Sequence, residues 1–348
     1  RGEPKRLLFL LMMVTALVSS ILADVPVVAM MFPVALFLLQ QNKCPVGESP
    51  FGKAVMLGIA LAALIGGVGT PAGSGTNILT INMLENAAHV SVSFFQWTAI
   101  GMPMVLLLTP VAWWALIKVY PPEIQHLVGM ESIGEDYARL GPLGRNEKCF
   151  LLFLSINLLL WCSSGTHGLP LPTAAVLGCV LFALPGVGLI TWEEDRSKIG
   201  WDILFLVGTA NSLGMALWEN GTATWIANAC LCGLNTLPLI MVIALVSLFT
   251  ILIHLVIPVN TPIVTVVLPP VVAIAVSMGI NPAILAVPLG FSVSAAVLLP
   301  LDSVSLVTYQ AGYYKMYDMF KPGIIISIAW IIITTALMYL IATPLGLM

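Results

Sequence analysis

The sequence predicts an all-α polytopic membrane protein, an inverted-topology repeat with two re-entrant helical hairpins and two unwound transmembrane helices. Three observations predict it. Hydrophobic residues make up 59% of the 348 residues and charged residues only 8%, against about 45–50% and 25% in soluble domains. Clusters rich in Gly, Pro, Asp and Asn interrupt several apolar runs. Finally, 13 Lys and Arg against 16 Asp and Glu leave no basic face for nucleic acid.

The first repeat is expected over residues 1–120. A hairpin over residues 7–40 turns at Ala23-Asp24-Val25-Pro26, and a broken helix over residues 54–84 is interrupted at Thr70–Asn77. A full span over residues 95–120 follows. The short arms cannot cross a hydrocarbon core of about 30 Å alone. Non-helical backbone at that depth requires protein or a water-filled cavity around it, so these breaks are candidate sites.

The second repeat is expected over residues 234–348. Its hairpin, residues 237–279, turns at Val259-Asn260-Thr261-Pro262, and its broken helix, residues 283–306, is interrupted at Leu301–Ser305. The last span covers residues 323–345. Residues 121–233 between the repeats are interpreted as a cytoplasmic loop and connecting spans.

Two patterns indicate that the repeats are inverted. Each hairpin tip has a second proline seven residues after the first, at Pro33 and Pro269, and each is followed by a break. If both hairpins are re-entrant, all Lys and Arg fall on one face, in residues 1–6, 43–53, 118–148, 196–198 and 315–321. The positive-inside rule makes that face cytoplasmic. We therefore expect a multi-pass protein of the plasma (inner) membrane.

Three ionisable residues lie deep within apolar segments: Asp24, His254 and Asp302. Such residues are costly in a membrane and are functional candidates by default. Helix breaks expose carbonyls that coordinate cations and N–H groups that attract anions. The alternatives are an N-cap role for each Asp and an inter-helix hydrogen bond for His254.

Three segments of the chain resemble the divalent-anion:sodium symporter family, the carriers of dicarboxylates, citrate and sulfate. They are Leu22–Pro33, Ile65–Asn77 and Gly312–Gly323. The resemblance implies hairpins tipped by Ser-Asn-Thr, with a sodium site and half of the anion site at each tip, and a homodimer. Family members have further N-terminal helices before the first hairpin, and we expect this chain to lack them.

The resemblance also assigns roles to individual residues. The first unwound motif of the family is matched at Gly73, Ser74 and Asn77. The Ser-Asn-Thr motif of the second hairpin tip is matched at two of its three positions, by Asn260 and Thr261. Asp24 and Asp302 replace neutral residues, so both departures add carboxylates. The implied cation ligands are Ser19, Asp24, Gly73, Asn260 and Asp302. The implied anion contacts are Ser74, Asn77, Asn260, Thr261 and Ser303.

The sequence thus favours a secondary active transporter of small divalent anions, of the dicarboxylate or sulfate class, rather than an enzyme. Its coupling ion would be sodium or the proton, with no organic cofactor and no other metal. The alternative is a cation/proton antiporter or metalloid-anion exporter of a related fold, using Asp24 and Asp302. An intramembrane aspartyl protease and a passive channel rank lower, because both aspartates lie at helix breaks and breaks at mid-membrane suit alternating access.

Overall fold

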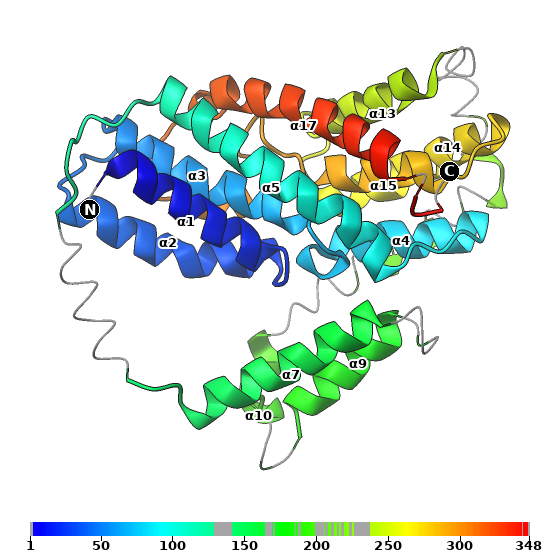
Figure 1. Cartoon of the computed structure of the whole chain (residues 1–348), viewed down its shortest axis with the longest axis horizontal. Coiled ribbons are helices and arrows are strands. Elements are labelled where there is room, and N and C mark those ends of the chain that lie inside the picture. Colours follow the sequence, from blue (N-terminus) through cyan, green and yellow to red (C-terminus); the bar gives the residue numbers. More distant parts are fainter. Residues whose placement is uncertain are drawn as a thin grey trace. The chain divides into compact units, whose positions relative to one another are not determined.

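The computed structural model describes residues 3–128, 141–163, 171–184, 189–198, 237–342 and 344–346, with isolated positions between these ranges. Every regular element among the described residues is helical (Figure 1). The chain divides into two compact units. The first comprises Arg1–Val92, Gln96–Met130 and Val207–Met348, and the second comprises Ser93–Phe95 and Glu131–Leu206. Most of residues 199–236, within the predicted connecting segment, lie outside the described residues.

The first half of the first unit begins with a pair of helices packed on a third. Small residues set this packing: Gly58 of α3 lies against Leu8 and Met12 of α1, and Gly66 lies against the carbonyl of Ala16. Therefore α1 and α3 run in the same direction, and α2, which returns the chain between them, packs beside both (Figure 1). The helices are α1 (Pro4–Ser19), α2 (Asp24–Gln41), α3 (Pro50–Gly67), α4 (Gly75–Ala88) and α5 (Phe94–Val119).

The second half contains five helices with a similar set of neighbours. As α1 and α2 both pack on α3, so α13 and α14 both pack on α15. In Figure 1, the α1/α2 pair and the α13/α14 pair lie towards opposite ends of the long helices α5 and α17. The helices are α13 (Leu239–Ile253), α14 (Asn260–Ser277), α15 (Ala283–Val293), α16 (Ser303–Tyr309) and α17 (Phe320–Ile341).

Each half of the first unit contributes one short helix that packs on the other half, an arrangement called here the exchange of α4 and α16. Helix α4, which follows the first break, packs on α14 and α15 of the second half. Helix α16, which follows the second break, packs on α2 and α3 of the first half. At the α4–α15 contact, Gly290 leaves room for Thr80 and for Trp97, whose ring meets Phe291 edge-on at 4.9 Å. The two breaks thus lie where the halves interpenetrate.

The second break is longer than the sequence indicated. We expected the helix that begins at residue 283 to run to Pro300, but α15 ends at Val293 and α16 begins at Ser303. Residues 294–300 are mostly apolar, so their composition carries no helix-stop signal before the proline. We attribute the early end of α15 to a tertiary contact. Gly323 of α17 lies against the Val297 carbonyl with no room for a Cβ, which fits non-helical backbone at that point.

A polar network ties one end of the first unit together. The Glu123 carboxylate accepts from the Phe51 backbone N–H at 2.8 Å and from the Ser49 hydroxyl, at the start of α3. Lys53 pairs with Asp318 at 2.9 Å. The Tyr120 hydroxyl donates to the Asp318 carbonyl at 2.6 Å, and burial, followed by the nearby Asp318 charge, raises the pKa of Tyr120, so that hydroxyl stays protonated.

We expect Glu123→Ala to lower the free energy of unfolding by about 1–3 kcal/mol, because buried donors at the start of α3 lose a charged acceptor. Thermal unfolding of the purified protein in detergent measures the change. The control is Glu48→Ala, also near the start of α3 but exposed, which should change stability by less than about 0.5 kcal/mol. Equal effects of the two substitutions would show that the network does not stabilise the fold.

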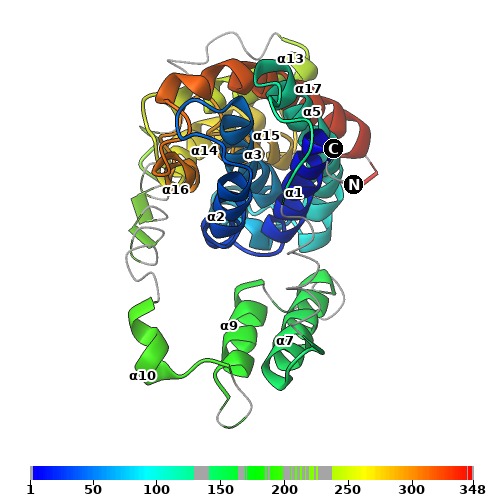
Figure 2. The same cartoon turned by 90° about the vertical axis from the view of Figure 1, so that its left-hand side faces the viewer.

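The second unit is built on two helices, α7 (Arg145–Cys162) and α9 (Leu171–Phe182), which lie side by side (Figure 2). Phe153 meets Phe182 edge-on at 5.6 Å, and Gly178 makes room for the buried side chain of Asn157. These two helices lie within the segment that was expected to hold a loop and connecting spans. The short helices α10 (Trp192–Asp195) and η2 (Arg196–Lys198) follow.

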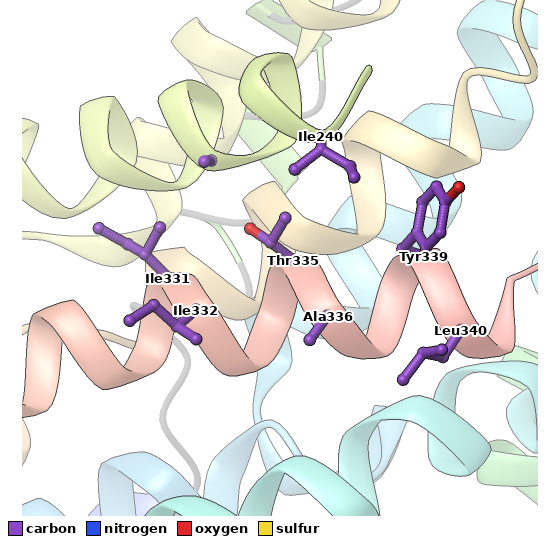
Figure 3. Close-up of a pocket in the computed structure, with 8 residues that line it drawn as sticks. Ile240, Ile331, Ile332, Thr335, Ala336, Tyr339 and Leu340 are labelled. Carbon is purple, nitrogen blue, oxygen red and sulfur yellow. The ribbon is translucent and has the colours of Figure 1, made fainter. Parts of the chain in front are cut away.

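Apolar surface is extensive, as a membrane requires. Five of the described helical segments are long and apolar enough to cross a bilayer: Asp24–Gln41, Pro50–Gly67, Phe94–Val119, Asn260–Ser277 and Met316–Ile341. A groove of about 530 Å³ lies between α13 and α17 (Figure 3). Its lining is apolar apart from Thr335 and Tyr339, and it contains none of the predicted site residues.

Candidate functional site

The first break is organised by the side chains of Asn77 and Thr70. Both residues bridge segments that have lost helical hydrogen bonds. Asn77 Nδ2 donates to the carbonyl of Gly67 at 2.7 Å and to that of Thr70 at 2.9 Å. Thr70 Oγ1 donates to the Ser20 carbonyl at 2.6 Å and accepts from the Ala72 N–H at 3.1 Å. These bonds hold the end of α3, the short helix η1 (Pro71–Gly73) and the end of α1 against one another.

Oxygen atoms converge on two glycines of this break. A Cβ at Gly73 would lie 2.6 Å from the Gly67 carbonyl and 2.8 Å from the Ser19 carbonyl. A Cβ at Gly67 would lie 3.5 Å from Asp24 Oδ2. Two carbonyls and a carboxylate, all from buried residues, therefore lie around this pair of glycines, and at Gly73 a side chain would displace them. Hard cations such as sodium prefer oxygen ligands of this kind. Three of the predicted cation ligands, Ser19, Asp24 and Gly73, thus come together.

The Ser19 hydroxyl donates its hydrogen to the Ala63 carbonyl at 2.8 Å, so its oxygen keeps lone pairs for a cation beside the Ser19 carbonyl. Asn77 differs from expectation. Both hydrogens of its Nδ2 are used inside the break, so it has no donor left for an anion. Its Oδ1 is buried without a hydrogen-bond partner. An unpaired buried oxygen favours a cation or a water molecule as its neighbour.

The second hairpin tip is held by a histidine. His254 follows the last residue of α13 and is 5% exposed. Its Nδ1 lies 3.0 Å from the Thr250 carbonyl, and its Nε2 lies 3.1 Å from Oδ1 of Asn260, the first residue of α14. The inter-segment hydrogen bond that we weighed for His254 is therefore present. Asn260 and Thr261 are both partly exposed, so a ligand can reach them.

The second break begins and ends with buried polar groups. Asp302 caps α16, accepting from the Val304 N–H at 3.0 Å, so the capping alternative holds for this aspartate. Ser303 is exposed. Ser292 and Ser294, where α15 ends, are buried with hydroxyls that have no partner. Sequence reasoning missed these two serines, because a serine inside an apolar run is more often a helix-packing residue.

The structure also connects the two predicted cation sites. Asp302 lies close enough to Asp24 and to His254 to interact with both electrostatically. We had assigned the two aspartates to separate sites. Helix α16 carries Asp302 to the tip of the first hairpin because it packs on α2. In the described part of the chain, no group of three or more His, Cys, Asp or Glu side chains is arranged so that it could hold a metal ion.

Several helix N-termini complete the site. Helices α2, α4, α14 and α16 begin at Asp24, Gly75, Asn260 and Ser303. Each N-terminus carries a partial positive charge and free N–H groups, which attract anions. Ser74 precedes α4, and its hydroxyl lies 2.9 Å from that of Thr76. The region therefore offers carbonyls and carboxylates for cations, with N–H and hydroxyl donors for an anion.

A known protein family matches almost the whole of this chain. Residues 3–348 match the family described as the sodium:sulfate symporter transmembrane region. The chain belongs to the sodium:sulfate symporter family. Sodium:sulfate symporters and their relatives are transporters rather than enzymes, and the apolar helices described above are those of an integral membrane protein.

The relatives are distant in sequence, and two of them align over nearly the whole chain. The sodium-dependent dicarboxylate transporter SdcS of Staphylococcus saprophyticus is 24% identical over 97% of this chain and 70% of its own length. The sodium-dependent high-affinity dicarboxylate transporter 3 of Caenorhabditis elegans is 26% identical over 98% of this chain and 68% of its own length. A membrane protein of Cupriavidus necator is 27% identical over 74% of this chain, which spans only 51% of that relative.

A solved structure shares the fold of this symporter-family chain. The YdaH transporter of Alcanivorax borkumensis superposes with a TM-score of 0.63 at 14% sequence identity. The alignment covers 98% of this chain and 79% of that one. At this identity the likeness concerns the fold alone, and it supports the all-helical transporter architecture that the sequence predicted.

Proposed function

We propose that the protein is a secondary active transporter of small divalent anions, of the dicarboxylate or sulfate class, coupled to sodium or protons. The observation that carries the proposal is the exchange of α4 and α16 between the halves, which brings both breaks and both hairpin tips to one region. Corresponding broken helices are the usual place of substrate and ion sites in secondary transporters. The sodium-dependent dicarboxylate transporters among its relatives favour the same class.

One cation would bind at the first break, to the carbonyls of Ser19 and Gly67, the carboxylate of Asp24 and the free Oδ1 of Asn77. These oxygens surround Gly73 or face the same break. A second cation, or a proton, would bind at Asn260 and Asp302. Ser74, Asn260, Thr261 and Ser303 would contact the anion, and Asn77 would act through its oxygen on the cation instead.

Charge balance explains why cations are needed. Among the described helices of the two halves, every Lys and Arg lies in a first or last turn, at Lys5, Arg6, Lys53, Lys118 and Lys321. No fixed positive side chain of these helices therefore reaches the breaks, whereas Asp24 and Asp302 are both buried there. A dianion in that region would be strongly disfavoured unless bound cations neutralised it.

We further propose that the hairpins are re-entrant and that the halves form an inverted repeat. The positions of Lys5, Lys43 and Lys53 are consistent with a hairpin that enters and leaves on one side, because α1 and α3 begin at the same end of the first unit and α2 ends there. The hairpins and their broken helices would move as one body against the remaining helices during alternating access, and the transporter would be a homodimer in the plasma (inner) membrane with its basic loops in the cytoplasm.

Uptake into proteoliposomes tests the function. An inward sodium or proton gradient should drive accumulation of succinate or sulfate above its external concentration. A potassium gradient of equal size, with empty liposomes as a second control, should not. If neither ion gradient accelerates the uptake of either anion beyond that of empty liposomes, the proposed function is wrong.

The topology makes a separate prediction. A single cysteine at position 43, in a background without the native cysteines, should resist an impermeant maleimide added outside intact cells and react after the cells are opened. A single through-going span over residues 7–40 would place Lys43 opposite Lys5. Labelling of position 43 from outside would therefore contradict the re-entrant hairpin.

Hydroxyl donors should set the anion affinity. Ser74→Ala and Thr261→Ala each remove one hydrogen bond to a charged ligand, so the Michaelis constant for the anion should rise about ten- to hundredfold. The control is Thr109→Ala, because the Thr109 hydroxyl donates only within α5, to the Val105 carbonyl at 2.7 Å. Wild-type constants in both site variants would place the anion elsewhere.

A further inference from the structure

His254 makes two hydrogen bonds that the proposed transport cycle has not yet used. Its imidazole bridges the last turn of α13, through Thr250, and the first residue of α14, Asn260. The ring is 5% exposed, whereas Asn260 is partly exposed. Residues 255–259, which join these helices, have no regular secondary structure. This side-chain bridge therefore spans the turn of the second hairpin.

The chemistry of the two contacts fixes what each ring atom does. The Thr250 carbonyl can only accept, so Nδ1 carries a hydrogen and donates it. Nε2 therefore meets the Asn260 carboxamide. A carboxamide has an oxygen at one end and an NH₂ group at the other, so it can pair with Nε2 whether or not that nitrogen carries a hydrogen. In either case one end of the amide is held and the other end remains available.

We infer that His254 is a positioning residue, which holds the Asn260 carboxamide at the second hairpin tip so that its free end contacts the transported anion or the coupling ion. This inference rests on the proposed function, because it gives Asn260 its ligand. It adds a residue that touches neither ligand itself.

The first hairpin tip is held in a different way. Val18 stands six residues before Asp24, as His254 stands six residues before Asn260. Asp24 Oδ1 accepts from the N–H of its own neighbour Val25 at 2.9 Å, and its Oδ2 lies against Gly67. Loss of His254 should therefore loosen the second tip and leave the first unchanged.

A pair of substitutions separates positioning from simple packing. In His254→Gln the amide group reaches the place of Nε2 and keeps a partner for Asn260, whereas in His254→Asn it reaches only the place of Nδ1 and the Thr250 carbonyl. We expect His254→Asn to raise the Michaelis constant for the anion, or the half-saturating sodium concentration, about tenfold. His254→Gln should stay within about threefold of wild type, because it keeps a partner at the Nε2 position.

Two readouts keep the inference independent of transport. Stabilisation of the purified variants by sodium with succinate or sulfate, measured as a thermal shift, reports binding without turnover. Maleimide labelling of a cysteine at position 256, which is 79% exposed beside the tip, reports how firmly the tip is held. His254→Asn should speed this labelling severalfold and His254→Gln should not. Melting temperatures without ligand confirm that both variants fold.

The possible outcomes are distinct. If the Gln and Asn variants fold and show equal constants and equal labelling rates, His254 is not a positioning residue. If wild-type protein transports neither anion, the proposed function fails. The labelling rates then decide by themselves whether His254 holds Asn260: a difference between the two variants retains the bridge, and no difference overturns it.

Discussion

Gly66→Ala should prevent the first hairpin from packing and should leave little folded protein in the membrane. Gly66 of α3 lies against the backbone of α1, and a Cβ there would overlap the Ala16 carbonyl. Since the obstacle is backbone, no side-chain rotation relieves it, and α1 must move away from α3. Overpacking of this kind costs about 1–3 kcal/mol, and more where the backbone cannot shift.

The measurement is the yield of monodisperse protein after detergent extraction, together with its melting temperature. The control is Gly75→Ala in the first turn of α4, where an added Cβ meets nothing within 4 Å. That variant should fold as well as wild type. A normal yield and melting temperature for Gly66→Ala would show that α1 does not lie on α3 as described.

Asp24→Asn and Asp302→Asn should change the ion dependence of transport more than any other single substitutions. Each removes one buried negative charge from a region with no fixed positive side chain. Asn keeps an oxygen ligand and nearly the same shape, so the fold should persist. An interaction with a charged group contributes about 1.5–3 kcal/mol to binding. Its loss should therefore raise the half-saturating sodium concentration about ten- to hundredfold.

Uptake into proteoliposomes against sodium concentration, repeated over a range of pH, measures this for wild type and both variants. Since Asp24 and Asp302 interact with each other, the double variant should not show the product of the single effects. If all three proteins give the same sodium and pH profiles, the aspartates are helix caps, and the coupling ion binds without them.

The ends of several helices could be predicted from the sequence, because turn-forming residues mark them. Ala23-Asp24-Val25-Pro26 marks the first hairpin tip, and α2 begins at Asp24. Thr70–Asn77 marks the first break, where the backbone is non-helical or 3₁₀. The early end of α15 could not be predicted in this way, because it depends on the contact between Gly323 and Val297, which are far apart in the sequence.

The same limit applies to the candidate site. The residue types at Asp24, Gly73 and Asp302 singled them out, and the structure brings Ser19, Asp24 and Gly73 together. Which atom of each residue is free depends on tertiary hydrogen bonds, however. The hydroxyl hydrogen of Ser19 and the amide hydrogens of Asn77 are used by Ala63, Gly67 and Thr70. A pattern of residue types does not contain that information.

The exchange of α4 and α16 has a consequence for biosynthesis. Helix α4 leaves the ribosome about 150 residues or more before α13–α15, so its partners do not yet exist when it enters the bilayer. Until they arrive, the face of α4 that packs on α14 and α15 has no protein partner. The nascent first half should therefore wait beside the insertion machinery or a membrane chaperone. Truncation before α14 should make the chain a substrate for quality-control proteolysis rather than a stable half-transporter.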